Sequence, residues 1–145
     1  MNTTVRQLIH RKGNAVWAVQ LDSTVFDALT FMAEKGVGAL LVFRGTQLAG
    51  IFSERDYARK VILKGKSSHE LTVGEIMTEN VICVRPDQSM ADCMALMTEK
   101  RIRHLPVLED DSIIGVISIG DVVKEIISEQ EFVIGQLENY IAGGR

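Results

Sequence analysis

Two short segments of the sequence combine a glycine, a serine and an aspartate at identical spacing. Gly50–Asp56 reads GIFSERD, and Gly115–Asp121 reads GVISIGD. A serine followed three residues later by an acidic residue, just before a helix, is typical of a capping box. The same groups could hold a nucleoside phosphate, because a helix N-terminus attracts phosphate and an aspartate can accept hydrogen bonds from both hydroxyls of a ribose.

Helix capping alone does not require a glycine three residues before the serine. Gly50 and Gly115 nevertheless occupy that position in the two segments. A glycine within a strand permits the close approach of another backbone or of a ligand. We therefore treat the serine and the aspartate of each segment as candidate binding residues, with capping as the alternative: Ser53, Asp56, Ser118 and Asp121.

The two segments belong to an internal repeat. Asp22 aligns with Asp87 at an offset of 65 residues, and this offset holds without a gap from Val16 to Leu63. Each copy has apolar residues at helical spacing, then two short apolar segments separated by turn residues, then a second helical segment. The sequence predicts an α/β (α+β) fold in which a helix–strand–strand–helix unit occurs twice. The predicted parts are residues 1–70, residues 71–128 and a C-terminal helical extension over residues 129–145.

The composition is that of an ordinary globular protein, with 24% charged residues and a net charge of −3. This balance gives no basic surface for nucleic acid, and no apolar run approaches the roughly 20 residues that span a bilayer. The three histidines lack metal-ligand spacing, and no phosphate-binding glycine loop is present. We expect a protein that is not an enzyme. Two cysteines outside any CxxC pair and no export signal favour a reducing compartment, the cytoplasm.

The repeated unit resembles the CBS domain, the module named after cystathionine β-synthase. The resemblance rests on VGALLVF and GIFSERDYARKV in the first copy, and on VGEIMTENVICVRPDQSM, RIRHLPVL and GVISIGD in the second. It implies a stand-alone Bateman module, in which two motifs pack about a pseudo-twofold axis and leave two clefts for adenosyl ligands such as AMP, ATP or NAD. It also implies a homodimer that regulates an unidentified client protein.

The resemblance further implies roles for individual residues. In this family the motif serine lies near the phosphate and the motif aspartate holds the ribose, which assigns Ser53 with Asp56 to one cleft and Ser118 with Asp121 to the other. The family lines the adenine with residues before the first helix and at the start of the first strand. The corresponding residues here are Thr78 to Ile82, Ile102 and Arg103, Val37 and Gly38.

The two copies differ in charge near the expected phosphate. Arg103 and His104 of the second copy align with Gly38 and Ala39 of the first. A partly buried phosphate needs a paired cation, which Arg103 could supply, whereas the first cleft could use Arg55 or Arg59 unless these arginines only form a solvated helix face. For His104, packing and ligand contact are both open. We expect the second cleft to prefer AMP, and the first to be empty, weaker or adapted to a longer ligand such as NAD.

Beyond the repeat, the tail keeps apolar residues at helical spacing: Val133, Ile134, Leu137 and Ile141. Such a stripe must cover something, either its own chain or a second copy, and the resemblance favours a homodimer. Two functions are open at this stage. The chain could be an adenine-nucleotide sensor whose conformation or stability changes on binding, or a structural dimerisation scaffold.

Overall fold

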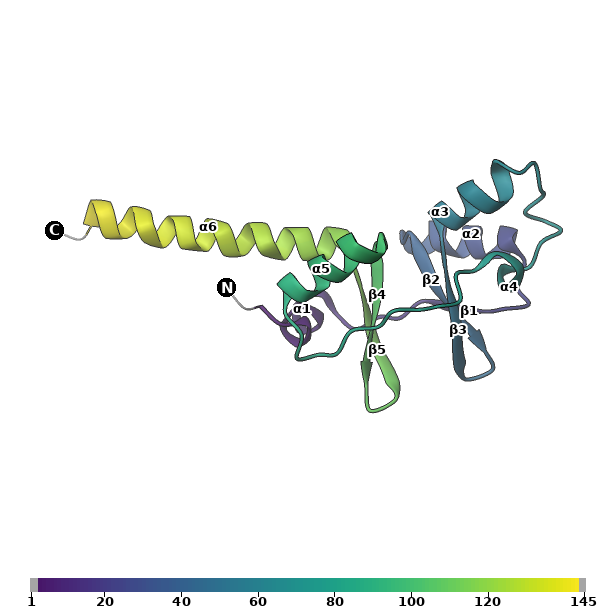
Figure 1. Ribbon diagram of the computed structural model, residues 1–145, viewed down its shortest axis with the longest axis horizontal. Helices are drawn as coiled ribbons and strands as arrows, with labels where there is room; N and C mark the ends of the chain where they lie inside the picture. The colour runs from purple at the N-terminus through teal and green to yellow at the C-terminus, as the bar shows by residue number, and fades with distance from the viewer. Residues whose placement is uncertain (1–2, 144–145) are drawn as a thin grey trace. The chain divides into compact units, whose positions relative to one another are not determined.

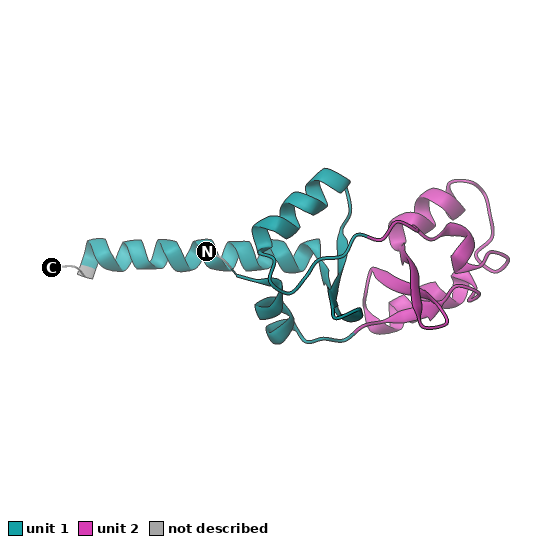
Figure 2. Cartoon of the chain, turned by 60° about the horizontal axis from the view of Figure 1, so that its bottom comes forward, with its two compact units in different colours: residues 1–15, 82–145 teal, residues 16–81 magenta. Residues whose placement is uncertain are grey.

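The computed structural model describes residues 3–143, which form two compact units (Figures 1 and 2). Unit 2 comprises Val16–Val81. Unit 1 combines the chain up to Ala15 with the chain from Ile82 onward. The N-terminal segment therefore packs with the second copy of the repeat, although it precedes the first copy in the sequence.

Unit 2 contains a three-stranded sheet in the order β1-β2-β3, in which β1 is parallel to β2 and β2 is antiparallel to β3. Its core contains buried side chains from α2, β2 and β3, among them Met32, Val42 and Phe52. The elements in chain order are β1 (Ala18–Gln20), α2 (Val25–Lys35), β2 (Ala39–Arg44), β3 (Gln47–Ser53), α3 (Glu54–Tyr57), the π-helical turn η1 (Ala58–Ile62) and α4 (Val73–Ile76).

Unit 1 contains a two-stranded antiparallel sheet, β4-β5. A bridge between Val84 and Val107 takes the place that the strand β1 has in unit 2. Helix α1 contributes Val5, Leu8 and Ile9 to the core. The elements in chain order are α1 (Val5–Lys12), α5 (Met90–Lys100), β4 (His104–Glu109), β5 (Ser112–Ser118) and α6 (Ile119–Gly143).

The repeated helices α2 and α5 begin and end in the same way. Thr24 caps α2 and Ser89 caps α5, each accepting a hydrogen bond from the backbone N–H three residues later. Both helices end at a residue in the left-handed conformation, Gly36 with φ 65° and Arg101 with φ 54°. Equal caps at both ends explain why the two helices have the same length despite few identical residues.

Each unit is completed by the segment that precedes the other copy. In unit 1 the N–H of Val5 donates to the carbonyl of Gln88 at 2.8 Å, and in unit 2 the N–H of Val25 donates to the carbonyl of Leu71 at 2.9 Å. Matching isolated bridges join Thr4 to Ser89 and Thr24 to Thr72. The domains predicted from the sequence end near residue 70, where the second copy was expected to begin. In the structure, the segment before the first copy instead belongs to unit 1, and the segment before the second copy belongs to unit 2.

Helix α6 continues without a break through the expected C-terminal extension, as far as the described residues reach. No helix in the part of the chain that the structure describes is long and apolar enough to span a membrane.

Candidate functional site

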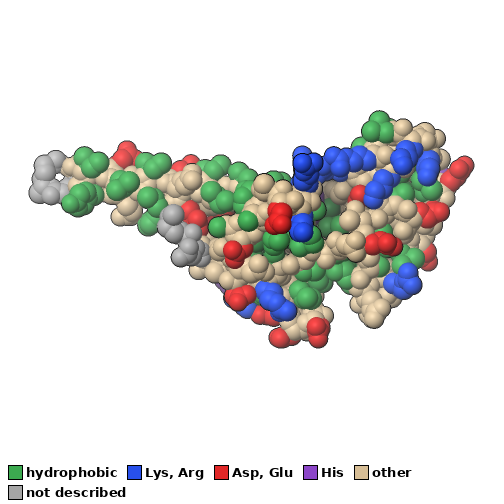
Figure 3. All heavy atoms as spheres, in the orientation of Figure 1, with side chains coloured by type: hydrophobic (Ala, Val, Ile, Leu, Met, Phe, Trp, Pro, Cys, Tyr) green, Lys and Arg blue, Asp and Glu red, His purple; other side chains and the backbone are tan. Residues whose placement is uncertain are grey.

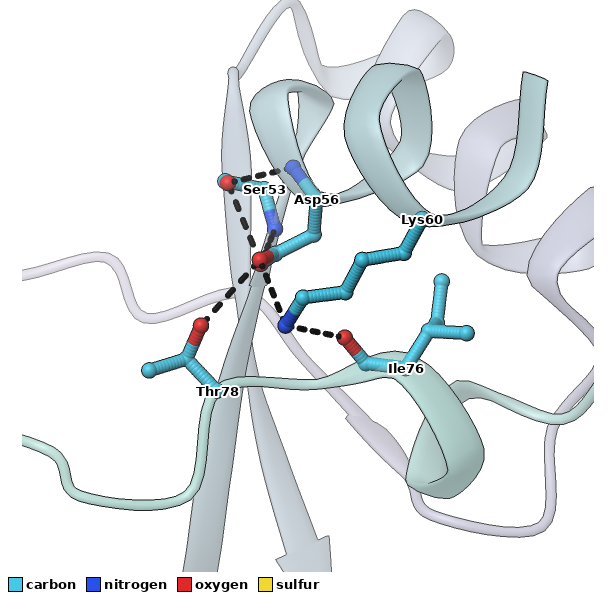
Figure 4. Close-up of polar contacts among 5 residues, drawn as sticks. All are labelled: Ser53, Asp56, Lys60, Ile76 and Thr78. Atoms are coloured by element: carbon cyan, nitrogen blue, oxygen red, sulfur yellow. Dashed lines mark hydrogen bonds and ion pairs between the residues drawn. The ribbon is translucent and has the colours of Figure 1, made fainter. Parts of the chain in front are cut away.

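The first candidate site surrounds the start of α3 in unit 2 (Figure 4). The N–H of Asp56 donates to Ser53 Oγ at 3.2 Å, and the N–H of Ser53 donates to Asp56 Oδ2 at 3.0 Å. This reciprocal pair is a complete capping box, so the capping alternative is confirmed for this segment.

Asp56 also has partners outside the capping box. Its Oδ1 accepts a hydrogen bond from Thr78 Oγ1 at 3.1 Å and lies 3.2 Å from Lys60 Nζ. The same Lys60 Nζ donates to the carbonyl of Ile76 at 3.0 Å. The buried carboxylate of Asp56 is therefore paired with a cation, and Thr78, expected at the site from the sequence, lies within hydrogen-bond distance of it.

Gly50 explains how Thr78 reaches Asp56. A Cβ at position 50 would lie 2.7 Å from the carbonyl oxygen of Thr78 and 2.6 Å from Met77 Sδ. Ile51 and Thr78 exchange two backbone hydrogen bonds of 2.9 Å, directly beside this glycine. The expected close approach is confirmed for Gly50, and the approaching group is the backbone of the segment that follows α4.

The second candidate site surrounds the start of α6 in unit 1. The N–H of Ser118 donates to Asp121 Oδ2 at 2.8 Å, and the N–H of Asp121 donates to Ser118 Oγ at 3.2 Å. Lys12 Nζ, at the end of α1, lies 2.5 Å from Asp121 Oδ2 and donates to the carbonyl of Val116 at 2.6 Å. The equivalent glycine, Gly115, is approached by the side chain of Ile9, whose Cδ1 would lie 2.6 Å from an added Cβ.

The electrostatics of the second site depend on Lys12. Burial by itself would raise the pKa of Asp121, but the Lys12 ammonium and the Ser118 N–H together lower it below its usual value. His104, which pairs with Ser118 across β4 and β5, has its pKa lowered by burial, by Lys12 and by Arg103, against an opposing effect of Asp121. The lowered pKa values favour the ionised form of Asp121 and the neutral form of His104.

Sequence reasoning missed both lysines. Lys60 follows Asp56 by four residues within SERDYARK, the spacing at which side chains on one helix meet, so this signal was available. Lys12 had no such signal, because it precedes Asp121 by 109 residues and reaches it only through the exchange of α1.

The loops before β2 and β4 lie beside the two serines. The N–H of Glu54 donates to the carbonyl of Gly38 at 3.1 Å, and the N–H of Ile119 donates to the carbonyl of Arg103 at 2.8 Å. These bonds place the expected adenine-lining loops at the two helix starts. The other expected residues lie as follows: Val37 is partly buried against the unit 2 core, Ile82 and Ile102 are partly buried against the unit 1 core, and Arg55 is half-buried on α3.

Two observations concern metal-binding and thiol groups. Among residues 3–143, no three His, Cys, Asp or Glu side chains gather in a way that could hold a metal ion. Burial, with a smaller contribution from Asp92, raises the pKa of Cys93 to about 11, so this thiol is protonated at neutral pH.

Comparisons with known proteins identify the family. The CBS domain family model matches residues 5–63 and 73–128. The chain is 43% identical over 153 residues to the CBS domain-containing protein CBSX3, mitochondrial, of Arabidopsis thaliana, an alignment that covers 99% of this chain and 74% of that protein.

Solved structures agree with this assignment. A protein with CBS domains from Burkholderia ambifaria has a TM-score of 0.85 and 53% sequence identity, covering 88% of this chain and 96% of that one. The hexameric CBS-CP12 protein from bloom-forming cyanobacteria has a TM-score of 0.76 and 27% identity, covering 85% and 67%. These likenesses confirm the predicted α/β fold with small sheets. The chain therefore belongs to the CBS-domain family, and its two copies form a tandem pair of CBS domains.

Proposed function

We propose that this chain is a regulatory module that binds an adenine nucleotide and signals its presence through a change in conformation or stability. Tandem CBS pairs are general regulatory modules that often bind adenosyl ligands. The observation that carries the proposal is the matched pair of sites: in each unit an aspartate at a helix start is held beside a lysine, Asp56 with Lys60 and Asp121 with Lys12.

The chemistry of this pair suits a nucleotide. The two hydroxyl groups of a ribose can each donate a hydrogen bond to the carboxylate. These hydrogen bonds can replace the ion pair that the carboxylate makes with the lysine. The displaced ammonium is then available for the phosphate of the same ligand, so the binding of an anion leaves no buried charge without a counter-ion. Ser53 and Ser118 would add a hydroxyl near the phosphate, and Arg103 or Arg55 a second cation.

The two sites differ in a way that supports unequal binding. The exposed fraction of the Asp121 side chain is 24%, whereas that of the Asp56 side chain is 11%. Lys12 is carried by a separate helix, while Lys60 is carried by the turn that follows Asp56. We therefore propose that AMP binds preferentially at the Asp121 site, and that the Asp56 site binds more weakly or takes a longer ligand such as NAD or ATP.

A second candidate function is a dimerisation scaffold without a ligand. The observation that favours it is that Asp56 and Asp121 already complete capping boxes and ion pairs with groups of the protein. In this alternative the aspartates only stabilise the two helix starts.

Thermal unfolding with and without nucleotide distinguishes the two candidates. A ligand at 100 times its Kd stabilises the native state by about 2.7 kcal/mol. Asp121→Ala should abolish most of the shift given by AMP. Asp92→Ala is a matched control, because Asp92 closes a capping box of the same kind with Ser89 at the start of α5, outside the repeated glycine–serine–aspartate segments, and should leave the shift intact.

One outcome of this experiment decides against the sensor, and another against the proposed role of the aspartates. If AMP, ATP and NAD all leave the midpoint unchanged, the scaffold is favoured. If the wild-type protein responds but Asp56→Ala and Asp121→Ala respond equally well, the aspartates do not hold the ribose.

We also propose that the chain self-associates as a homodimer and acts on a client protein. The hexameric CBS-CP12 protein supports self-association among related folds. For the compartment, the free thiols of Cys83 and Cys93 support a reducing environment. The Arabidopsis relative is named as mitochondrial, so the cytoplasm stays a prediction for this chain.

A further inference from the structure

Helix α6 has an exposed apolar stripe with a regular repeat. Successive members are separated alternately by four and three residues, the spacing of a two-helix seam. Its apolar members are exposed, with Leu137 at 56% and Ile141 at 76%, and apolar side chains are visible along the helix in Figure 3. We call this stripe the α6 seam; its members are Val123, Ile127, Gln130, Ile134, Leu137 and Ile141.

The seam is not the face that α6 uses within unit 1. That face contributes Val122 and Ile126 to the core, and it carries Glu125, which pairs with Arg11 at 2.8 Å. Further along, Glu129 Oε1 accepts the N–H of Thr3 at 2.9 Å. Successive residues on a helix are rotated by about 100°, so the seam is turned away from these contacts. Its own unit therefore leaves it uncovered.

We propose that the α6 seam binds the α6 seam of a second copy of this chain in an antiparallel pair. From Val123 to Ile141 the seam spans about 27 Å at 1.5 Å per residue. In the antiparallel register that uses its full length, Val123 faces Ile141 of the second copy, and Ile127 faces its Leu137. Near the centre, Gln130 faces Ile134 of the second copy.

Charges beside the seam select this orientation. Lys124, Glu131 and Glu138 are exposed and form one flank of the seam at intervals of seven residues. Antiparallel pairing places Lys124 of each copy beside Glu138 of the other, giving two attractive pairs, with a single repulsive contact between the Glu131 side chains. Parallel pairing would place Glu131 and Glu138 against Ile126 and Val133 of the second copy, with no opposite charge to meet them.

The other flank of the seam is apolar. Val133 and Tyr140 are exposed there and widen the surface that a second helix would cover. In the antiparallel register Val133 meets Val133 of the second copy, and Tyr140 lies beside the partly buried Ile126, at the edge of the face that α6 packs into its own core. Phe132 is 67% exposed but lies on the opposite side of α6, so it takes no part in the pair.

The oligomeric state of the full chain tests the pair, measured by analytical ultracentrifugation over a range of micromolar concentrations. We expect a wild-type dimer, and we expect Leu137→Glu to raise its dissociation constant at least tenfold. Phe132→Glu is the matched control, with the same substitution on the same helix, and should leave the constant unchanged. The circular dichroism of each variant checks that the chain remains folded.

Charge exchange tests the orientation with a second set of variants. Lys124→Glu should weaken the dimer, and the double variant Lys124→Glu, Glu138→Lys should restore it, because only antiparallel pairing brings these positions together. Failure of the double variant to restore the dimer would overturn the proposal, as would a dimer that Leu137→Glu weakens no more than Phe132→Glu does. The inference rests on the proposed self-association. A wild-type monomer would overturn both the self-association and the pairing of the α6 seams, whereas a dimer that is insensitive to Leu137→Glu would overturn only the pairing of the seams.

Discussion

Replacement of Gly50 by alanine tests how the first site is built. The added Cβ would lie 2.7 Å from the carbonyl oxygen of Thr78, a backbone atom that cannot rotate away. Overpacking of this kind costs about 1–3 kcal/mol. If the chain relieves it by moving Thr78, the two hydrogen bonds between Ile51 and Thr78 weaken, at about 1 kcal/mol each. We expect Gly50→Ala to lower the free energy of unfolding by about 2–4 kcal/mol.

Gly115→Ala is the matched control at the equivalent position of the second copy. Its Cβ would meet the Cδ1 of Ile9, the end of a side chain that can change rotamer. Alanine also loses less conformational entropy than glycine in a strand, by about 0.5–1 kcal/mol. The two contributions nearly cancel, so Gly115→Ala should change the stability by about 1 kcal/mol or less.

Urea unfolding can separate the two effects. The single tryptophan, Trp17, lies in unit 2 with Gly50, and its fluorescence therefore reports on that unit, while circular dichroism reports on the whole chain. With an m-value of about 2 kcal/mol/M, Gly50→Ala should lower the fluorescence midpoint by about 1–2 M. Equal midpoint shifts for the two alanine variants would refute the explanation from backbone approach.

Three further predictions concern the second site. The pKa of Asp121 is lowered in the folded chain, so the carboxylate stabilises the fold above its unfolded pKa, and this contribution is lost as the pH falls through its folded pKa. Lys12→Met should therefore lower the free energy of unfolding by about 0.5–1 kcal/mol at pH 7. It should also move acid unfolding, followed by circular dichroism, to higher pH. Because the pKa of His104 is lowered, its imidazole resonances in an NMR titration should change below the usual histidine range, and a pKa at or above that range would contradict its burial. If AMP displaces Lys12 from Asp121, hydrogen exchange of the α1 amides should change on AMP binding, and unchanged exchange would contradict that displacement.

Much of the fold could be predicted because both copies carry the same local signals. Capping residues such as Thr24 and Ser89, apolar residues at helical spacing and turn residues act over a few positions, so the sequence displays them directly. The four motif residues were found for the same reason, since each serine and aspartate pair lies within one helix start. Only their partners depend on the rest of the chain.

Long-range partners could not be predicted from local patterns in the sequence. Lys12 reaches Asp121 because the segment before the first copy packs with the second copy, and no local pattern encodes that packing. Thr78 was expected at the site only through the family resemblance. The role of Gly50 could be predicted only in part. Its position in the strand indicated that another group approaches it closely, but the sequence did not show that this group is the backbone of Thr78. Position in the repeat predicts the geometry within a copy, but the cation of the second site comes from a segment that is exchanged between the copies.

The two copies keep their aspartates but obtain the cation from different places, and this difference has a structural cause. The repeat places Glu125 where the first copy has Lys60, so the second copy has no lysine four residues after its aspartate. Helix α1 supplies two cations instead: Lys12 pairs with Asp121, and Arg11 pairs with Glu125 at 2.8 Å. Helix α1 is therefore attached to α6 by two ion pairs, and one of them uses Asp121, the carboxylate that is proposed to hold a ribose. A ligand at the first site would compete with a lysine in the next turn of its own helix, whereas a ligand at the second site would compete with the anchor of a different helix. For a sensor, occupancy of the second site would act on the ion pair that holds α1, whereas occupancy of the first would act on Thr78 and on the contact of Lys60 with Ile76.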